Sequence, residues 1–379
     1  MRAAIATALE DAIERLRALD LGDAFDPRAS AAIVDAGLHR LCVPTSAGGL
    51  EASLSEAAEV LLALGAIDGS TALGFAMQVH VTGTMRDGAA FPEAVLERLY
   101  RAIVADGALL NNAATEEGGG SPARGAIPGT TAVADAAHAD GTWRLTGEKT
   151  WTTWLPNLAY AFVTARIDDD DAAPEIGTFL VGLTADGVER RAGFEALGMR
   201  GSASGRLVLS GAPAELVGRR GAAEPDPRGH APGAWFGIAI AAVYLGIGEG
   251  ARNDVARWAR DRRPGDGSTA VADIPSVQLR LGRLDAELRA ARIVVLDVAR
   301  RWDADRDATD VGLAKLVATR AAVSATDGAL RIAGGPGFLA GRLERAFRDA
   351  RAGLINPPLE DVALQGFART VLEREEGLR

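Results

Sequence analysis

Hydrophobic and polar positions follow three successive patterns along this chain. Over residues 1–112 apolar residues such as Ile5 and Leu9 recur at helical spacing, which predicts amphipathic helices. Over 113–218 short apolar runs alternate with glycine-rich turn signals, which predicts strands of a small β domain. Over 219–379 the helical spacing returns. The pattern therefore predicts a mostly α protein made of an N-terminal helical domain, a central β-barrel and a C-terminal four-helix bundle over these three ranges.

Individual helices and strands can be predicted from the same pattern. Residues 72–85 carry no charged side chain and are apolar on most sides, which predicts a buried helix. Further helices are predicted over 54–64, 311–332 and 361–376. One longer helix has an unbroken apolar seam with three- and four-residue spacing, typical of a helix packed in a bundle; its seam is Leu281, Leu284, Leu288, Ala291, Val295, Val298 and Trp302. Strands are predicted at 143–145, 160–167, 178–183 and 207–209, and a loop at 219–233.

Composition narrows the classes of function. The net charge is −10 with the two signs interspersed, which disfavours a nucleic-acid-binding role. One cysteine, Cys42, and four histidines without ligand spacing disfavour a metal site. The N-terminal residues are broken by charges, and no apolar run reaches the ~18 residues of a membrane span. We therefore expect a cytoplasmic protein without a membrane span.

The segment Gly147–Trp154 is the first candidate for chemistry. It reads Gly-Glu-Lys-Thr-Trp-Thr-Thr-Trp and lies among the predicted strands. Threonine and tryptophan favour strands, so the simplest interpretation is a half-buried strand whose indoles pack in a core. The alternative is that an indole faces a flat aromatic ligand.

Other motifs around this segment decide between the two interpretations. A glycine-rich element, Ala114–Ser121, precedes it, and Leu197–Ser204 follows it. Gly334–Gly337 and Leu343–Ala350 come near the end of the chain. In this order and at these separations, the motifs resemble those of the acyl-CoA dehydrogenase family of flavoproteins over nearly the whole chain. The resemblance implies the family fold, FAD as cofactor, and self-association as a dimer or tetramer, because the family's flavin site spans two subunits.

The resemblance also implies particular contacts with the cofactor. Family members place the tryptophan of a Trp-x-Thr element beside the flavin and bond flavin N5 through its threonine, which implies Trp151 and Thr153 here; Trp154 keeps the core interpretation. The Thr-Glu element implies Thr115 and Ser121, with Gly120 and its neighbour Gly119 allowing close approach of backbone N–H groups to anionic oxygens. A proline usually follows the first glutamate of that element, whereas this chain has Glu117.

Further cofactor contacts are implied in the C-terminal part. The turn at Gly334 and Gly335 resembles the one that reaches the flavin of a neighbouring subunit, and Arg331 takes the place of the usual glutamine. Arg262 falls near the family's phosphate-binding arginine, although the usual Phe-Gly is missing. An arginine could hold a cofactor phosphate through its planar fork. A helix-end loop with a surface arginine is the alternative interpretation.

The catalytic base is the main departure from the family pattern. In most members a glutamate lies eight residues after the aspartate of the Arg-Asp-Ala motif, which in this chain is Pro357. A minority place it near the position of Phe236. Neither residue can take a proton. A longer loop could bring Glu360 or Asp361 into the same space. The alternative is that these two acidic residues cap the last helix.

Three functions remain open at this stage. The first is oxidation of an acyl thioester, on coenzyme A or a carrier protein, at the α,β bond, with a separate electron acceptor. The second is monooxygenation by the same fold, with reduced flavin delivered by a separate flavin reductase. The third is a flavin-binding partner subunit without turnover. The substrate's chain length and head group cannot be predicted from the sequence.

Overall fold

The computed structural model describes residues 1–88, 90–118, 126–135, 141–167, 175–191, 193–221, 224–265 and 267–376. The chain forms two compact units, each built from segments that are separate in sequence. Unit 1 comprises Met1–Ala52, Gly74–Ala196 and Arg200–Trp235. Unit 2 comprises Ser53–Leu73, Leu197–Met199 and Phe236–Arg379.

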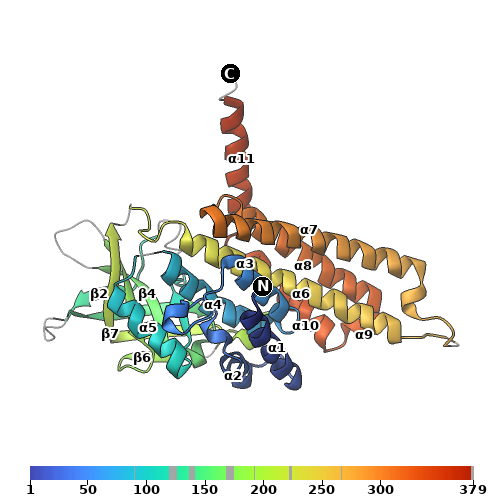
Figure 1. Cartoon of the computed structure of the whole chain (residues 1–379), viewed down its shortest axis with the longest axis horizontal. Coiled ribbons are helices and arrows are strands. Elements are labelled where there is room, and N and C mark those ends of the chain that lie inside the picture. The colour runs from blue at the N-terminus through green and yellow to red at the C-terminus, as the bar shows by residue number, and fades with distance from the viewer. Residues whose placement is uncertain are drawn as a thin grey trace. The chain divides into compact units, whose positions relative to one another are not determined.

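Strands of unit 1 close into a ring. Their hydrogen-bonded order is β1-β4-β2-β3-β7-β5, and an additional pairing of β5 with β4 completes a five-membered cycle, with β1 and β6 attached at β4 and β7. Figure 1 shows the labelled strands β2, β4, β6 and β7 lying together. The predicted central β-barrel is thereby confirmed. The strands are β1 Leu110–Ala113, β2 Thr131–Ala134, β3 Thr142–Thr152, β4 Tyr160–Ile167, β5 Glu175–Gly182, β6 Val188–Arg191 and β7 Gly205–Gly221.

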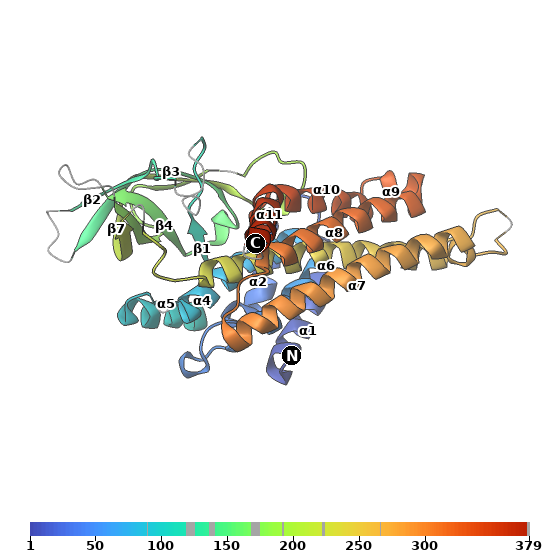
Figure 2. The same cartoon turned by 90° about the horizontal axis from the view of Figure 1, so that it is seen from above.

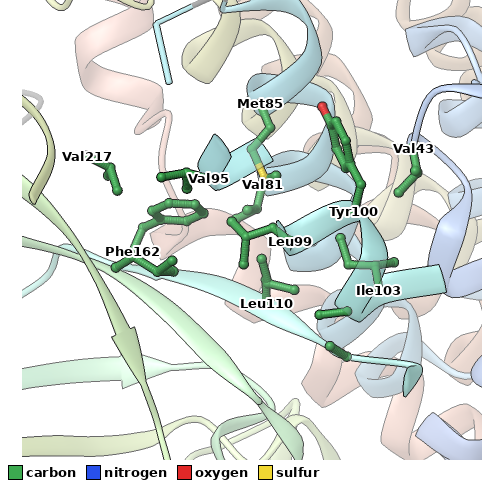
Figure 3. Packing of buried hydrophobic residues seen from close by; sticks show 13 residues of the cluster. Val43, Val81, Met85, Val95, Leu99, Tyr100, Ile103, Leu110, Phe162 and Val217 are labelled. Carbon is green, nitrogen blue, oxygen red and sulfur yellow. The ribbon is translucent and has the colours of Figure 1, made fainter. Parts of the chain in front are cut away.

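Two helices of unit 1 pack on this ring. The helices of the unit are α1 Ala3–Ala18, α2 Pro27–Asp35, α5 Glu93–Asp106 and the larger part of α4 Gly69–Asp87. Leu99 and Ile103 of α5 and Val81 of α4 share one buried cluster with Leu110 of β1 and Phe162 of β4 (Figure 3). This apolar contact fixes α4 and α5 on the barrel wall near the start of β1.

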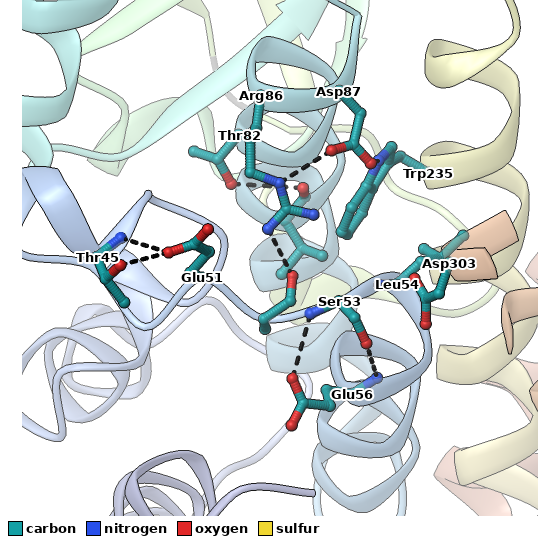
Figure 4. Close-up of polar contacts among 12 residues, drawn as sticks. Thr45, Glu51, Ser53, Leu54, Glu56, Thr82, Arg86, Asp87, Trp235 and Asp303 are labelled. Carbon is teal, nitrogen blue, oxygen red and sulfur yellow. Dashed lines mark hydrogen bonds and ion pairs between the residues drawn. The ribbon is translucent and has the colours of Figure 1, made fainter. Parts of the chain in front are cut away.

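The end of α4 is fixed by polar contacts as well. Arg86 donates to Asp87 Oδ1 at 2.9 Å and to the carbonyl of Ala52 at 2.8 Å (Figure 4). The other carboxylate oxygen of Asp87 accepts from Trp235 Nε1 at 2.9 Å, and the Arg86 guanidinium lies 5.3 Å from the centre of that indole. A buried ion pair is thus satisfied on both sides, as burial of two charges requires.

Unit 2 is helical, and its longest helices run side by side (Figure 2). The seam predicted for α7 is buried from Leu284 to Trp302, with Leu281 partly buried. The Asp303 carboxylate at its end accepts from the backbone N–H groups of Leu54 and Ser55, the first turn of α3. The helices are α3 Leu54–Gly65, α6 Ala231–Asp261, α7 Pro275–Asp305, α8 Val311–Ala333, α9 Gly335–Phe338, α10 Arg342–Ile355 and α11 Glu360–Glu376.

The predicted order of helices, strands and helices is confirmed, with several local differences; the strands β2 and β6, for example, were not singled out beforehand. β7 continues through Arg219 and Arg220, which were expected in a loop, because both pair with β5. α10 was not singled out beforehand. α6 is long and apolar enough to cross a membrane, but 83% of its apolar window is buried inside the protein. The division into domains at residues 112 and 218 stays a prediction.

Candidate functional site

The end of β3 presents Trp151 in an unusual way. β3 pairs with β7 up to Lys149, and the register then shifts before Thr152. Trp151 lies in the shifted stretch with a φ of 57°, a left-handed conformation that non-glycine residues adopt only when their surroundings enforce it. Its side chain is 51% exposed, whereas Trp154 is buried. Trp154 is therefore the core indole that the simplest interpretation predicted, and Trp151 is free for another role.

Thr153 is held from both its side chain and its backbone. Its Oγ1 lies 3.0 Å from Ser204 Oγ, which in turn lies 2.9 Å from Ser202 Oγ. Its carbonyl accepts from Asn111 Nδ2 at 3.0 Å. Thr153 is buried, so its hydroxyl has a fixed position. A threonine placed in this way can offer one directed hydrogen bond to a ligand beside Trp151.

The turn after β1 is joined to β3 by two contacts next to this position. The carbonyl of Thr115 accepts from Thr150 N at 2.9 Å, and Glu116 Oε1 accepts from Lys149 Nζ at 2.5 Å. Glu116 also accepts from the backbone N–H of Gly129 at 2.6 Å and of Thr130 at 3.0 Å. Lys149 is fully buried.

The charge state of Glu116 follows from these contacts. Burial alone would raise the pKa of its carboxyl, but hydrogen bonds from Lys149 and Thr130 outweigh burial and lower the pKa to about 2. Burial also lowers the pKa of Lys149, and the Glu116 carboxylate opposes that effect. The Glu116 carboxylate is therefore ionised at neutral pH, and its ion pair with Lys149 clamps the Thr115 turn onto β3.

The described part of this region fits a flat, polar-edged cofactor. Asn112 Oδ1 and Thr152 Oγ1 are buried and have no hydrogen-bond partner among the described residues. Buried polar atoms normally have partners, so these two atoms, one on β1 and one on β3, can take hydrogen bonds from a ligand or water. With the exposed Trp151 indole they match the needs of a flavin ring. Gly119, Gly120 and Ser121, predicted to line the cofactor, lie outside the described residues.

Predicted cofactor residues of unit 2 lie in helix-terminal settings. Arg331 forms an ion pair with Asp327 one turn earlier, at 2.8 Å, and is mostly exposed. Gly334 ends α8 with a φ of 63°, and Gly335 begins α9. Arg262 follows α6 directly and is exposed, and its carbonyl accepts from Val271 N at 2.9 Å. These settings resemble the helix-end alternative, and the proposed cofactor role of all four residues stays a prediction.

Glu360, the candidate base, is the first residue of α11, and its carboxylate forms an ion pair with Arg320. Lys315 is near enough for the Glu360 charge to act on it; burial, which dominates, lowers the pKa of Lys315 to about 8. In the same loop Asn356 donates to the Tyr244 hydroxyl at 2.6 Å. Glu360 is the first acidic residue after Pro357. Its carboxylate is paired with the Arg320 guanidinium.

Two residues that the sequence did not indicate extend from Trp151: Phe194 contacts the indole, and Arg206 contacts Phe194. The Phe194 ring stacks on the indole with centroids 4.3 Å apart and planes 29° apart. The Arg206 guanidinium lies over Phe194, 5.4 Å from its centroid. Phe194 precedes the Leu197–Ser204 motif by three residues, and Arg206 follows that motif by two. The motif itself was therefore the only signal that could have directed attention to them.

Comparison with known proteins agrees with this fold. Residues 111–212 match the acyl-CoA dehydrogenase middle domain, and residues 235–356 match the acyl-CoA dehydrogenase C-terminal domain. The chain is 33% identical over 346 residues to the putative acyl-CoA dehydrogenase YdbM of Bacillus subtilis, a match that covers 89% of this chain and 88% of that protein. The chain belongs to the acyl-CoA dehydrogenase family. The family uses a flavin cofactor, which confirms the predicted class of cofactor.

Other relatives carry different activities on the same fold. The chain is 28% identical over 332 residues to the amino sugar nitrososynthase DnmZ of Streptomyces peucetius, covering 84% of this chain and 79% of that protein. The solved structure of butyryl-CoA dehydrogenase from Megasphaera elsdenii superposes with a TM-score of 0.85 at 20% identity, covering 98% of this chain and 99% of that one. Members of the family bind acyl-CoA substrates and self-associate. Members of the family are therefore flavin-dependent oxidoreductases or oxygenases.

Proposed function

We propose that this chain is an FAD-dependent enzyme that oxidises an acyl thioester at its α,β bond. The observation that carries the proposal is the set Thr115, Trp151 and Thr153, which the Glu116–Lys149 pair and the Ser204 hydroxyl hold at one end of β3. Such a set suits a flavin ring with a hydrogen-bonded edge. Similarity to a putative acyl-CoA dehydrogenase over most of both chains supports the substrate class.

In the proposed reaction each group has one task. Glu360 takes the α-proton of the thioester, while the β-hydrogen leaves with its electron pair, so the product is the α,β-unsaturated thioester. A bound flavin would supply the acceptor for that hydride. Trp151 would cover the ring, and the Thr153 hydroxyl would bond its edge. A separate electron acceptor then takes the two electrons, and self-association completes the cofactor site.

Arg320 sets a condition on this role of Glu360. The carboxylate forms an ion pair with the Arg320 guanidinium through its Oε1 atom. Proton abstraction therefore falls to Oε2, or it requires the pair to open when the substrate binds. Replacing Arg320 with glutamine would relieve this restraint without removing the base.

The second candidate function is flavin-dependent monooxygenation. Two observations favour it: proline stands at the family's usual base position, and a nitrososynthase is similar over most of its length. In that reaction the chain needs no α-proton base, and it depends on a flavin reductase for reduced flavin. Thr153 and Trp151 would hold the cofactor in the same way in both reactions.

Anaerobic mixing of the flavin-loaded protein with a panel of acyl-CoAs separates the candidates. Acyl thioester oxidation predicts bleaching of the flavin absorbance that is lost in Glu360→Gln and kept in the neighbouring control Asp361→Asn. Bleaching that survives in Glu360→Gln would remove Glu360 as the base. Absence of bleaching, together with an oxygenated product formed from externally reduced flavin and oxygen, would establish the second candidate. Stoichiometric flavin with neither reaction would indicate a non-catalytic partner subunit.

A further inference from the structure

Four side chains of unit 1 form a continuous series that ends at Trp151. Phe194 stacks on the Trp151 indole at 4.3 Å, and the Arg206 guanidinium lies over Phe194 at 5.4 Å. Arg206 Nη1 lies 2.8 Å from Glu117 Oε2 and 2.8 Å from Glu148 Oε1. We refer to Glu117, Arg206, Phe194 and Trp151 together as the Trp151 stack. Its members come from the turn after β1, from β7, from the loop after β6 and from β3.

The two ends of this series, Glu117 and Trp151, lie where the turn after β1 and the end of β3 need a further restraint. Glu117 occupies the position where the family usually has proline, a residue that stiffens a turn through its fixed φ. Here the turn is tied to the barrel instead, through the ion pair of Glu117 with Arg206. Trp151 has a left-handed backbone and lies where β3 leaves its ladder, so the ladder does not determine the direction of its ring.

Phe194 restrains the direction of the Trp151 ring, which the ladder does not determine. An aromatic ring stacked on an indole restricts the tilt of that indole, and a guanidinium over the phenyl ring holds the phenyl in turn. One face of the indole is then covered, and the side chain remains 51% exposed. The exposed remainder is the surface available to a flavin.

We propose that the Trp151 stack is a positioning device, in which Phe194 and Arg206 fix the plane of the Trp151 indole for the flavin ring. The proposal rests on the placement of the flavin against Trp151, and it does not depend on which reaction the enzyme performs. Phe194 and Arg206 act through Trp151, so they are positioning residues. Glu117 couples the same device to the Thr115 turn, so the two sides of the cofactor site are held together.

The test is flavin binding to the apoprotein, followed by the fluorescence of FAD and of FMN. Since a stacked aromatic pair contributes on the order of 1 kcal/mol, Phe194→Leu is expected to weaken binding about three- to tenfold. Phe194→Tyr keeps the ring and should restore the wild-type affinity. In the Trp151→Leu background, Phe194→Leu should have no further effect, because there is no indole to position. Equal effects in both backgrounds, or no recovery with tyrosine, would overturn the proposal.

The charged part of the stack has a matched control on the same strand. Arg206→Gln should weaken flavin binding about two- to threefold and reduce its dependence on salt, since the ion pairs are partly exposed and screened. Arg219 also lies on β7 and pairs with Glu175 at 3.5 Å, so Arg219→Gln should bind flavin as the wild type does. Equal effects of the two substitutions would overturn the role of Arg206. Unaltered binding in Trp151→Leu would instead remove the flavin from Trp151 altogether, a distinct failure.

Discussion

The Trp154 indole lies directly against the backbone of Gly74. A Cβ atom on Gly74 would come within 2.0 Å of the ring, so only glycine allows α4 to approach so closely. Trp154 is 1% exposed, has a φ of 56°, and donates its backbone N–H to Ser202 O at 2.8 Å. Gly74 and Ser202 therefore fix the residue that directly follows Thr153.

Gly74→Ala is the substitution that tests this contact. The added methyl group overlaps the indole and forces Trp154 or α4 to move, which should lower the free energy of unfolding by about 1 to 3 kcal/mol. Gly282→Ala is the matched control, because Gly282 lies within α7 with no atom within 4 Å of the added Cβ; it should leave the stability unchanged or raise it by about 0.5 to 1 kcal/mol. Denaturant unfolding of both variants measures the difference. A Gly74→Ala protein as stable as Gly282→Ala would show that the contact is not restrictive.

The sequence predicted the strand that carries the candidate site, but not its distortion. Trp151 and Trp154 are three residues apart, so regular alternation places them on opposite faces. In the structure Thr152, Thr153 and Trp154 are all buried in succession, because the left-handed residues 151 and 154 break the alternation. No sequence pattern marks such a break at tryptophan, and only the resemblance to a family separated the two indoles.

Contacts between neighbouring strands of the barrel could not be predicted from the sequence for a different reason. Arg206 reaches Glu148 because β7 pairs with β3 in a register that places Leu207 opposite Lys149. Register depends on the closed ring as a whole and cannot be read from one strand. In unit 2 the opposite holds for α7, whose apolar seam has a helical period over its length. α6 was not singled out beforehand, because its residues 231–248 carry no charged side chain and are apolar on most sides, so no helical period shows there.

The Glu116–Lys149 pair predicts a loss of stability in acid. The folded pKa of Glu116, about 2, lies below its ordinary value of 4.5, so the folded state holds the proton less tightly than the unfolded chain. The stabilisation is complete above about pH 4.5 and is lost as the pH falls towards 2. The amount is on the order of 3 kcal/mol. Glu116→Gln should remove this part of the pH dependence and leave Lys149 as a buried cation without a carboxylate.

Unfolding free energies at pH 7 and pH 3.5 measure that effect. Glu148→Gln is the control. Glu148 is an acidic residue next to Lys149 on β3, and its partners Arg206 and Arg191 are partly exposed. The wild type and this control should lose similar amounts between the two pH values, and Glu116→Gln should lose clearly less. A Glu116→Gln protein with the wild-type pH dependence would contradict the prediction.

Asp349 predicts a pH dependence of the opposite sign. It is buried in unit 2 and accepts from Met199 N at 2.5 Å. Burial raises the pKa of its carboxyl to about 6 from an ordinary value of 3.8, despite that hydrogen bond. The folded state therefore binds a proton that the unfolded chain releases, and stability falls as the pH rises from about 4 to about 6. Asp349→Asn is neutral throughout and can still accept from Met199, so its unfolding free energy should stay level across that window. An unchanged slope in this variant would contradict the assignment.

The Thr153 hydroxyl predicts a difference between binding and stability. Thr153→Val removes the group expected to bond the flavin, and should weaken flavin binding about three- to tenfold, in line with one hydrogen bond of about 1 kcal/mol. It also removes a partner of Ser204, so stability should fall as well. Ser204→Ala removes the same internal contact but keeps the Thr153 hydroxyl; it should lower stability and leave flavin binding within about twofold of the wild type. Thr153→Ser also keeps a hydroxyl at this position, and its flavin binding should likewise stay within about twofold of the wild type. Titration of the apoprotein with flavin, together with denaturant unfolding, separates the two effects. Equal weakening of flavin binding by Ser204→Ala and Thr153→Val would mean that Thr153 only supports the barrel and does not contact the cofactor.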